Sequence, residues 1–317
     1  MSAQELHDAI NGATEAPVDW RAEVARLSKL PPIEYDRERQ AAAAALGCLA
    51  STLDHEVRVA RGAGSGPMGQ GAPLDLPEIE PWPERVDGSR LLTEIAAAVR
   101  AHVILPAETA HALAIWAVFT HCLDVFDFAP RLLLKSPEPG CGKTTLLDVL
   151  AELSPRPLPV NNITASALFR AVELARPTVI IDEADTFLTE NEELRGLVNS
   201  GHRRSIAFVV RNTEIQGQHE PRKFSTWAAM VIAGLGGQHR TIEDRSIVVE
   251  LRRKLPGERT ARLDGEARQR LHRLARHAAR WVLDHRLEIA KANPVVSELQ
   301  NRAADNWGPL LMIARAA

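Results

Sequence analysis

The order of hydrophobic and polar positions divides much of the chain into short apolar runs and longer amphipathic stretches. The apolar runs have the length of buried strands and lie at 132–134, 179–181, 229–233 and 247–251. Apolar positions three and four residues apart predict helices over 89–101, 107–126 and 143–153, and from 164 or 166 to 175. Strands that alternate with helices favour a parallel sheet with right-handed crossovers.

Two further patterns surround this core. Residues 206–210 and 224–227 flank a polar turn, which predicts a β-hairpin. Residues 258–292 carry many arginines at helical spacing and predict a long helical region. The helical pattern continues to Ala317, so we expect that a C-terminal piece is missing.

The N-terminal part is predicted to be a small helical domain. An alanine-rich stretch at 37–49 is interrupted by Gly47, and Ser51 is placed to begin a second helix that runs to Arg61. This spacing is compatible with a DNA-binding helix-turn-helix and equally with a helical docking module. Glycine and proline then recur from 62 to 83, which predicts a linker. The expected domains are therefore 1–61, the linker 62–83, a core over 84–255 and a helical C-terminal segment over 256–317.

Composition narrows the class of protein. The 317 residues are 45% hydrophobic and 25% charged, as in ordinary globular proteins. A net charge of −3 argues against a uniformly basic nucleic-acid coat but allows a local basic patch. The three cysteines lie far apart, which favours neither a disulfide framework nor a metal site. No secretory signal and no apolar stretch of about 18 residues is present, so we expect a cytoplasmic protein with no membrane span.

A glycine-rich segment follows the first predicted core strand. Residues 137–144 read PEPGCGKT, which matches the phosphate-loop pattern G-x-x-x-x-G-K-[ST] except that Pro137 replaces the first glycine. Such a loop turns its backbone N–H groups toward phosphates, while the lysine reaches the β- and γ-phosphates and the hydroxyl ligates Mg²⁺. The residues expected to bind ATP are Pro139, Gly140, Cys141, Gly142, Lys143, Thr144 and Thr145.

Two adjacent carboxylates follow the second predicted core strand. A strand at 179–181 would carry Asp182 to its carboxyl end, beside the phosphate loop. We expect Asp182 and Thr144 to hold Mg²⁺, and Glu183 to orient and deprotonate the attacking water. The expected catalytic residues are therefore Lys143 and Glu183, and the cofactors are ATP and Mg²⁺.

A third catalytic group is expected from a neighbouring subunit. Arg245 precedes the last predicted core strand, where ring ATPases present an arginine to the adjacent subunit's γ-phosphate, and Arg240 is the reserve candidate. The alternative for Arg245 is a surface ion pair with Glu243 or Asp244. A polar residue usually ends the preceding strand in such enzymes, but Ala233 and Gly234 occupy that place.

Basic residues gather around the predicted hairpin. Projecting into the pore of a ring, they could grip a phosphate backbone; the alternative is a solvated hairpin or a subunit contact. The residues in this candidate nucleic-acid set are His202, Arg203, Arg204, Arg211, Arg222 and Lys223.

These motifs carry a family resemblance. Residues 82–254 resemble an uncharacterised P-loop ATPase domain of phage and mobile-element primase–helicase proteins, which is similar to superfamily 3 helicases in the AAA+ class. The matching segments are 136–144, 162–170, 182–188, 193–204, 224–227 and 244–247. The resemblance implies a P-loop NTPase, AAA+-like α/β fold with a parallel sheet flanked by helices. It further implies a homo-hexameric ring on single-stranded DNA and a primase as a partner.

The expected function is an ATP-hydrolysing oligomeric DNA helicase or translocase in mobile-element or phage replication. The alternative is an ATP-switched DNA-binding or helicase-loader protein with little unwinding activity, which the missing polar residue at 233–234 favours. A small-molecule kinase is a weaker third hypothesis, because Glu183 is typical of hydrolysing enzymes.

Overall fold

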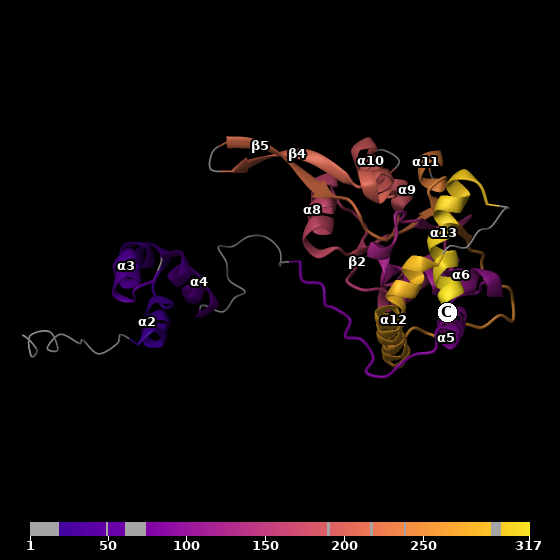
Figure 1. Cartoon of the computed structure of the whole chain (residues 1–317), viewed down its shortest axis with the longest axis horizontal. Helices are drawn as coiled ribbons and strands as arrows, with labels where there is room; N and C mark the ends of the chain where they lie inside the picture. The colour runs from indigo at the N-terminus through magenta and orange to yellow at the C-terminus, as the bar shows by residue number, and fades with distance from the viewer. Residues whose placement is uncertain are drawn as a thin grey trace, which may run out of the picture. The chain divides into compact units, whose positions relative to one another are not determined.

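The computed structural model describes residues 19–48, 50–60, 74–188, 191–215, 218–237, 239–292 and 299–317. The chain divides into two compact units, Met1–Pro73 and Leu74–Ala317, each of which has its own elements (Figure 1). Residues 62–73 of the predicted linker, and Arg61 before it, lie outside the described part. Residues 74–87 contain neither helix nor strand.

The first unit is built from helices. These are α2 (Trp20–Leu27), α3 (Pro32–Ala45) and α4 (Ala50–Ala60), and their buried residues form a core of their own. The turn between α3 and α4 passes through Gly47, whose φ of 63° is accessible to glycine without strain. The helix–glycine–helix order therefore agrees with the alanine-rich pattern, whereas α2 was not predicted.

The second unit contains a five-stranded sheet in the order β2-β3-β6-β1-β7. Its strands are β1 (Arg131–Ser136), β2 (Pro157–Val160), β3 (Thr178–Ile181), β6 (Met230–Leu235) and β7 (Ser246–Glu250). All of the pairings are parallel, so the predicted α/β fold with a parallel sheet is confirmed. Strand β2 was not predicted, because its two prolines are compatible only with an edge strand.

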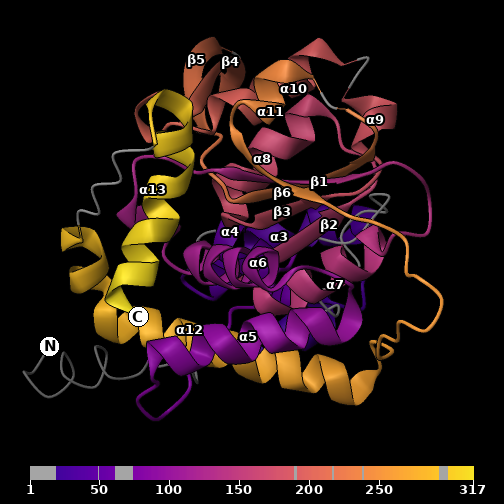
Figure 2. The ribbon, with the colours of Figure 1, turned by 90° about the vertical axis from the view of Figure 1, so that its right-hand side faces the viewer.

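Helices cover both faces of this sheet (Figure 2). Alternate residues of β1 face opposite ways: Leu132 and Leu134 join one buried cluster and Leu133 joins the other. The first cluster packs against α5 (Gly88–His102), α6 (Ala107–Thr120), α7 (Lys143–Leu153), α12 (Gly265–Lys291) and α13 (Asn301–Ala316). The second packs against α8 (Ala165–Ala175), α9 (Ala184–Phe187), α10 (Glu192–Ser200) and α11 (Arg240–Glu243).

Two predicted helices of the second unit have wrong boundaries, and in the first unit the helix predicted at 37–49 is α3, Pro32–Ala45. The helix predicted to reach residue 126 ends at Thr120, and a separate 3₁₀ turn, η1 (Leu123–Val125), follows. The helix predicted from residue 258 begins only at Gly265, because the Asp264 carboxylate caps it by accepting from Ala267 N at 2.9 Å. Residues 251–264 instead run as an irregular segment beside α5, where Ala261 N donates to Ala101 O at 2.7 Å.

The predicted hairpin is confirmed and is longer than expected. Strands β4 (Phe208–Ile215) and β5 (Gln218–Ser225) pair antiparallel and project from the second unit (Figure 1). A 3₁₀ turn, η2 (Arg204–Ile206), precedes β4. The sequence of β5 is polar because none of its residues is buried, so no apolar run indicated the full length of the strand.

Within the described residues, no single helix has the length and apolarity needed to cross a membrane. In the described part of the chain, one helix pair, α5 and α6, meets both conditions when its two helices are taken together, although they are bent by 118°.

Candidate functional site

The glycine loop, residues 137–142, connects the carboxyl end of β1 to the first turn of α7. Gly140 and Gly142 have φ values of 81° and 86°, in the left-handed region that glycine adopts most readily. Gly142 is the N-cap of α7 and provides no side chain to cap it. The first N–H groups of a helix lack intrahelical partners and carry partial positive charge, so this end of α7 is suited to an anion.

Lys143 and Thr144 follow the loop directly and lie close to groups from other strands. Lys143 Nζ donates to Ser136 Oγ, at the end of β1, at 2.5 Å. Thr144 Oγ1 donates to Asp182 Oδ2, after the end of β3, at 3.2 Å. Residues far apart in the sequence therefore meet at the carboxyl edge of the sheet, the edge at which β1, β3 and β6 end.

Glu183 adopts an unusual backbone conformation. Its φ and ψ are 54° and 37°, a left-handed conformation that is uncommon for residues other than glycine. The Asp182 Oδ1 atom accepts from the Glu183 N–H at 2.9 Å and stabilises this turn. Glu183 is exposed and also borders the cavity beside the glycine loop. Strained residues of this kind concentrate at functional sites.

Asp185 supplies a polar group at the end of β6 that the sequence did not reveal. Its Oδ1 accepts from Leu235 N, the last residue of β6, at 3.0 Å. The strand itself provides no polar side chain here, since Ala233 is apolar and fully buried and Gly234 has no side chain. Asp185 therefore supplies the carboxylate at this strand end. The only sequence signal was its position two residues after Glu183.

A cavity of about 640 Å³ opens between these groups, a volume typical of small-molecule sites. Besides the loop and the carboxylates, its lining comes from the α5–α6 connection and from the segment after β7. Leu235, the last residue of β6, also lines the cavity, and the other lining residues are His102, Val103, Ile104, Arg252, Lys254 and Thr260. The residues at 251–264, predicted in part to be helix, thus form one side of the cavity.

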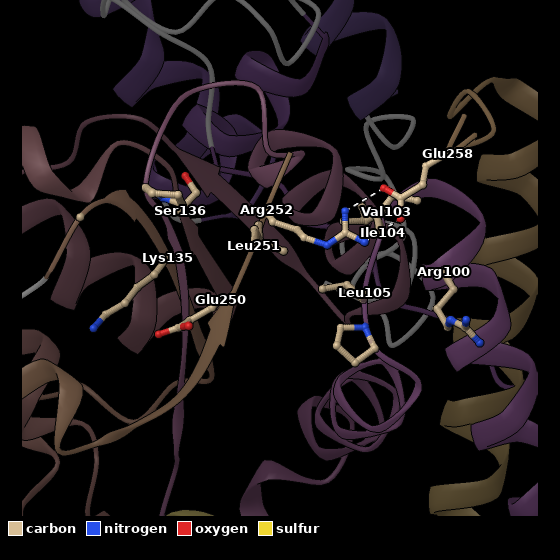
Figure 3. Close-up of a pocket in the computed structure, with 13 residues that line it drawn as sticks. Arg100, Val103, Ile104, Leu105, Lys135, Ser136, Glu250, Leu251, Arg252 and Glu258 are labelled. Carbon is tan, nitrogen blue, oxygen red and sulfur yellow. Dashed lines mark hydrogen bonds and ion pairs between the residues drawn. The ribbon is translucent and has the colours of Figure 1, made fainter. Parts of the chain in front are cut away.

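A second cavity, of about 840 Å³, adjoins the first, because both are lined by Val103, Ile104 and Arg252 (Figure 3). Arg252 reaches across it to Glu258, with Nη2 2.6 Å from Oε1. The Arg252 guanidinium and the Leu255 N–H lower the pKa of Glu258 to about 2. This ion pair stabilises a turn within the irregular segment, in which Glu258 N also donates to Leu255 O at 3.1 Å.

Arg245 lies at the opposite end of the strands. It directly precedes β7, and its carbonyl accepts from Arg131 N, the first residue of β1, at 3.0 Å. We call this the amino edge of the sheet. Arg245 and Lys143 are therefore not brought together within one chain. Arg240 is exposed at the start of α11.

The alternative role predicted for Arg245, an ion pair with Glu243 or Asp244, is not seen among the described residues. Glu243 instead pairs with Lys135, and Arg245 Nη1 donates to the Thr241 carbonyl at 2.7 Å. Burial, and then the charge of Arg302, lower the pKa of Arg245.

The candidate nucleic-acid residues divide between the hairpin and its base. Arg211 and Arg222 are directly opposite each other on β4 and β5, whereas Lys223 is opposite Val210 and so belongs to the other face. Arg211 is also held by Glu193 at 2.6 Å, and the Lys223 ammonium lies 4.6 Å from the centre of the Phe208 ring. The hairpin cations therefore form two small groups and not one patch.

His202 does not belong in this set, which corrects the prediction. It is 1% exposed, and its Nε2 lies 2.8 Å from Asn306 Oδ1. The neighbouring Arg203 and Arg204 are exposed, but they line different cavities. A sequence pattern could not separate these three residues, because their burial depends on packing against α13 and the loop after α6.

Among families of known proteins, one family model matches the C-terminal part of the chain. A family model described as a protein of unknown function, DUF3631, matches residues 250–317. That match begins after the glycine loop and the acidic pair Asp182 and Glu183, and it lies at and beyond the end of β7. No curated protein sequence matches the chain significantly.

Solved structures similar to the chain include the C-terminal region of NrS-1 in several apo forms. One A-form structure of this region is 13% identical, with a TM-score of 0.38 over 79% of this chain and 55% of that one. An A-form structure of its residues 305–718 is 14% identical, with a TM-score of 0.37 over 74% and 50%. A further apo structure of 305–718 is 15% identical, with a TM-score of 0.39 over 77% and 55%. The chain thus spans about half the length of these structures.

Proposed function

We propose that this chain is an ATP-hydrolysing, oligomeric DNA helicase or translocase that acts in mobile-element or phage replication. One observation carries the proposal: the Thr144 hydroxyl and the Asp182 carboxylate meet at 3.2 Å beside Lys143, inside a cavity of about 640 Å³. A phosphate loop and an acidic strand end in contact are the parts that nucleotide hydrolysis requires. The motif resemblance of residues 82–254 supports the replicative role.

The residues at this edge fit a Mg²⁺-bound nucleotide. Thr144 and Asp182 offer a hydroxyl and a carboxylate oxygen, and Mg²⁺ is usually held by few protein ligands together with phosphates and water. When bound, Mg²⁺ would neutralise charge on the phosphates.

The remaining roles follow from position. The glycine loop and the N-terminus of α7 would hold the phosphates, and Lys143 would exchange its bond to Ser136 for one to the terminal phosphates. Glu183 would orient and deprotonate the attacking water. Asp185, fixed to the end of β6, would supply the polar group that Ala233 and Gly234 lack.

The oligomeric part of the proposal rests on Arg245. Since this arginine is at the amino edge and the glycine loop is at the carboxyl edge, Arg245 would serve the nucleotide of a neighbouring copy. Head-to-tail contacts of this kind close into rings, and a hexamer is the ring size that the resemblance implies. The hairpin, with Arg211, Arg222 and Lys223, would then face single-stranded DNA in the pore.

A nucleotide-switched DNA-binding or loader protein is the second candidate. The absence of a polar side chain at Ala233 and Gly234 favours it, because hydrolysis without such a group would be slow. The carboxylate of Asp185 at the same strand end weakens this argument.

The decisive experiment is the ATPase rate of the purified chain with and without single-stranded DNA. A motor predicts turnover that DNA stimulates and that Arg245→Ala abolishes. Tight ATP-dependent DNA binding with no stimulated turnover would support the switch, and no ATP binding at all would refute both. Particle images with ATP and DNA would show whether a ring forms.

A further inference from the structure

A third cavity, which we call the arginine pocket, lies at the amino edge of the sheet. Its volume is about 340 Å³. Arg203, Arg245 and Arg302 supply its cationic lining, and Asp305 is the single carboxylate among the described lining residues. Arg203 directly precedes η2, Arg245 directly precedes β7, and Arg302 is in the first turn of α13, so only the fold brings these arginines together.

The arginines of this pocket form no ion pair within the described residues. In the part of the chain that the structure describes, none of the three arginines is within ion-pair distance of a carboxylate. Many other arginines of this chain do form ion pairs, such as Arg252 and Arg268. Exposed arginines commonly pair with nearby acids, so three unpaired ones that converge on one cavity leave room for an external anion.

A buried arginine, Arg131, adds positive charge near the arginine pocket. Arg131 is 1% exposed, and its guanidinium donates only to the carbonyls of Val198 and Ala228, at 2.6–3.2 Å. Burial, with the nearby charge of Arg245, lowers its pKa to about 9. Buried charges are normally paired, so this unpaired cation beside the pocket raises its affinity for anions.

A hydrogen-bonded chain orients Arg302. Asn306 Nδ2 donates to the Asp244 carbonyl at 3.2 Å, which leaves Asn306 Oδ1 to accept from His202 Nε2 at 2.8 Å. His202 Nδ1 is then the acceptor for Arg302 Nη1 at 3.3 Å. Because the chain starts at Asp244, it couples Arg302 on α13 to the residue preceding Arg245.

We propose that Arg203, Arg245 and Arg302 together form a phosphate-binding pocket that receives the terminal phosphate of a nucleotide held by a second copy of this chain. Arginine forks suit phosphate oxygens, and a small pocket suits a chain-terminal phosphate better than a continuous nucleic-acid backbone. The partner's nucleotide rests on the proposed function of the glycine loop, whereas the anion site itself does not. Arg203 and Arg302 would thus assist Arg245.

The first arm of the test probes the pocket without nucleotide. Inorganic sulfate is the probe, added to the full chain with Lys143→Ala so that the glycine loop is impaired, at constant ionic strength against chloride. We expect the midpoint of thermal unfolding to rise with sulfate in this variant, and the rise to disappear when Arg302→Ala or Arg245→Ala is added. Arg90→Ala, an exposed arginine on α5, is the matched control and should keep the rise.

The second arm tests whether the pocket acts between copies. Arg302→Ala should lower the ATPase rate about 10²-fold while nucleotide affinity is unchanged, and Arg302→Lys should recover only part of it. Lys143→Ala subunits cannot use ATP but still present an intact pocket. Mixing them with Arg302→Ala subunits should therefore give more activity than the sum of the two.

The two arms separate the possible failures. An inactive wild type with sulfate stabilisation intact would refute the proposed function and the nucleotide ligand, while the anion pocket itself would stand. Sulfate stabilisation unchanged by Arg302→Ala would overturn the pocket. Mixed oligomers with no activity gain, together with weakened single-stranded DNA binding in Arg302→Ala, would overturn the nucleotide ligand and assign the pocket to nucleic acid.

Discussion

The two edges of the central sheet differ in how their chemistry is encoded. At the carboxyl edge, Lys143, Thr144, Asp182 and Glu183 come from two short runs that each follow a strand. At the amino edge, the arginine pocket draws single residues from α10, α13 and the connection before β7. The first kind of site can be recognised in a linear sequence, whereas the second exists only after helices have packed.

The two edges also differ in the groups that would bind a ligand, which are backbone N–H groups at one edge and arginine side chains at the other. The glycine loop depends on backbone conformations at Gly140 and Gly142 that place N–H groups at a helix end. The arginine pocket depends on the charge of three arginines that form no ion pair among the described residues. A nucleotide bound at the carboxyl edge of one copy and contacted by the amino edge of a second copy would require both kinds of group. Each edge can therefore be tested separately.

The largest expected effect is at the carboxyl edge. Glu183→Gln removes the base that deprotonates water while keeping size and hydrogen-bonding capacity, so the ATPase rate should fall about 10³-fold with little change in nucleotide affinity. Steady-state turnover and equilibrium binding on the same preparation would check this. Full activity in Glu183→Gln would remove this residue from the site and leave Asp185 as the carboxylate to test.

A steric test comes next, at the amino edge. A Cβ on Gly201 would lie 2.1 Å from the Thr226 carbonyl oxygen and 2.5 Å from Arg131 Nη2. Gly201→Ala should therefore lower the free energy of unfolding by about 3 kcal/mol, because backbone must shift to admit the methyl group.

Gly196, on the exposed face of α10, is the matched control for Gly201. Nothing lies within 4 Å of a Cβ placed there, so Gly196→Ala should raise the free energy of unfolding by about 1 kcal/mol through helix propensity. Urea unfolding of both variants measures the contrast, and equal effects at the two positions would contradict the packing described for Arg131.

The pH dependence of stability is a smaller test of the same edge. Burial, followed by the charges of Arg131, Arg302 and Arg245, lowers the pKa of His202 to about 4, and burial likewise lowers the pKa of His121 to about 4. The unfolded chain, with histidine pKa values near about 6.5, binds more protons than the folded chain between these limits. The free energy of unfolding should therefore fall as the pH drops from about 6.5 to 4, by at most about 3 kcal/mol per histidine.

Two histidine variants refine that measurement. His202→Gln should remove part of this pH slope, since His121 and His277, whose pKa values burial also lowers, supply the rest. His111, exposed on α6, is the matched control, and His111→Gln should leave the slope unchanged. A slope insensitive to His202→Gln would show that this imidazole is not held neutral against Arg302.

The smallest expected effect concerns the hairpin, which leaves the sheet at the amino edge. Arg222→Ala and Lys223→Ala should each reduce the salt dependence of single-stranded DNA binding by about one unit of slope if each contacts one phosphate. Because these side chains are on opposite faces, a strand gripped on one face would be sensitive to only one of them. Binding isotherms across a salt series would decide between these outcomes.

Much of the core could be predicted from the sequence because its signals are local. The apolar runs around Leu132, Ile180, Val231 and Val249 marked buried strands, and Gly140 and Gly142 marked the loop that follows the first of them. Strand β2 was not predicted because the prolines Pro157 and Pro159 argue against any strand except one at the edge of a sheet. The start of α12 escaped it because the cap at Asp264 is a short-range contact that periodicity does not detect.

The parts of the candidate sites that were missed depend on contacts between distant segments. Asp185 became a site residue only because β6 ends beside α9. Arg302 and Asn306 became relevant only because α13 packs against the loop that holds His202. For the same reason His202 resembled a surface cation in sequence but is buried in the structure.

The most direct test of the central claim is the affinity of the chain for a fluorescent ATP analogue with Mg²⁺, measured at equilibrium. The account predicts saturable binding that weakens at least about tenfold in Lys143→Ala, a loss of about 1.4 kcal/mol, and that Lys291→Ala at the end of α12 leaves unchanged. Binding of equal strength in the wild type and Lys143→Ala, or none in either, would contradict a nucleotide site at the glycine loop.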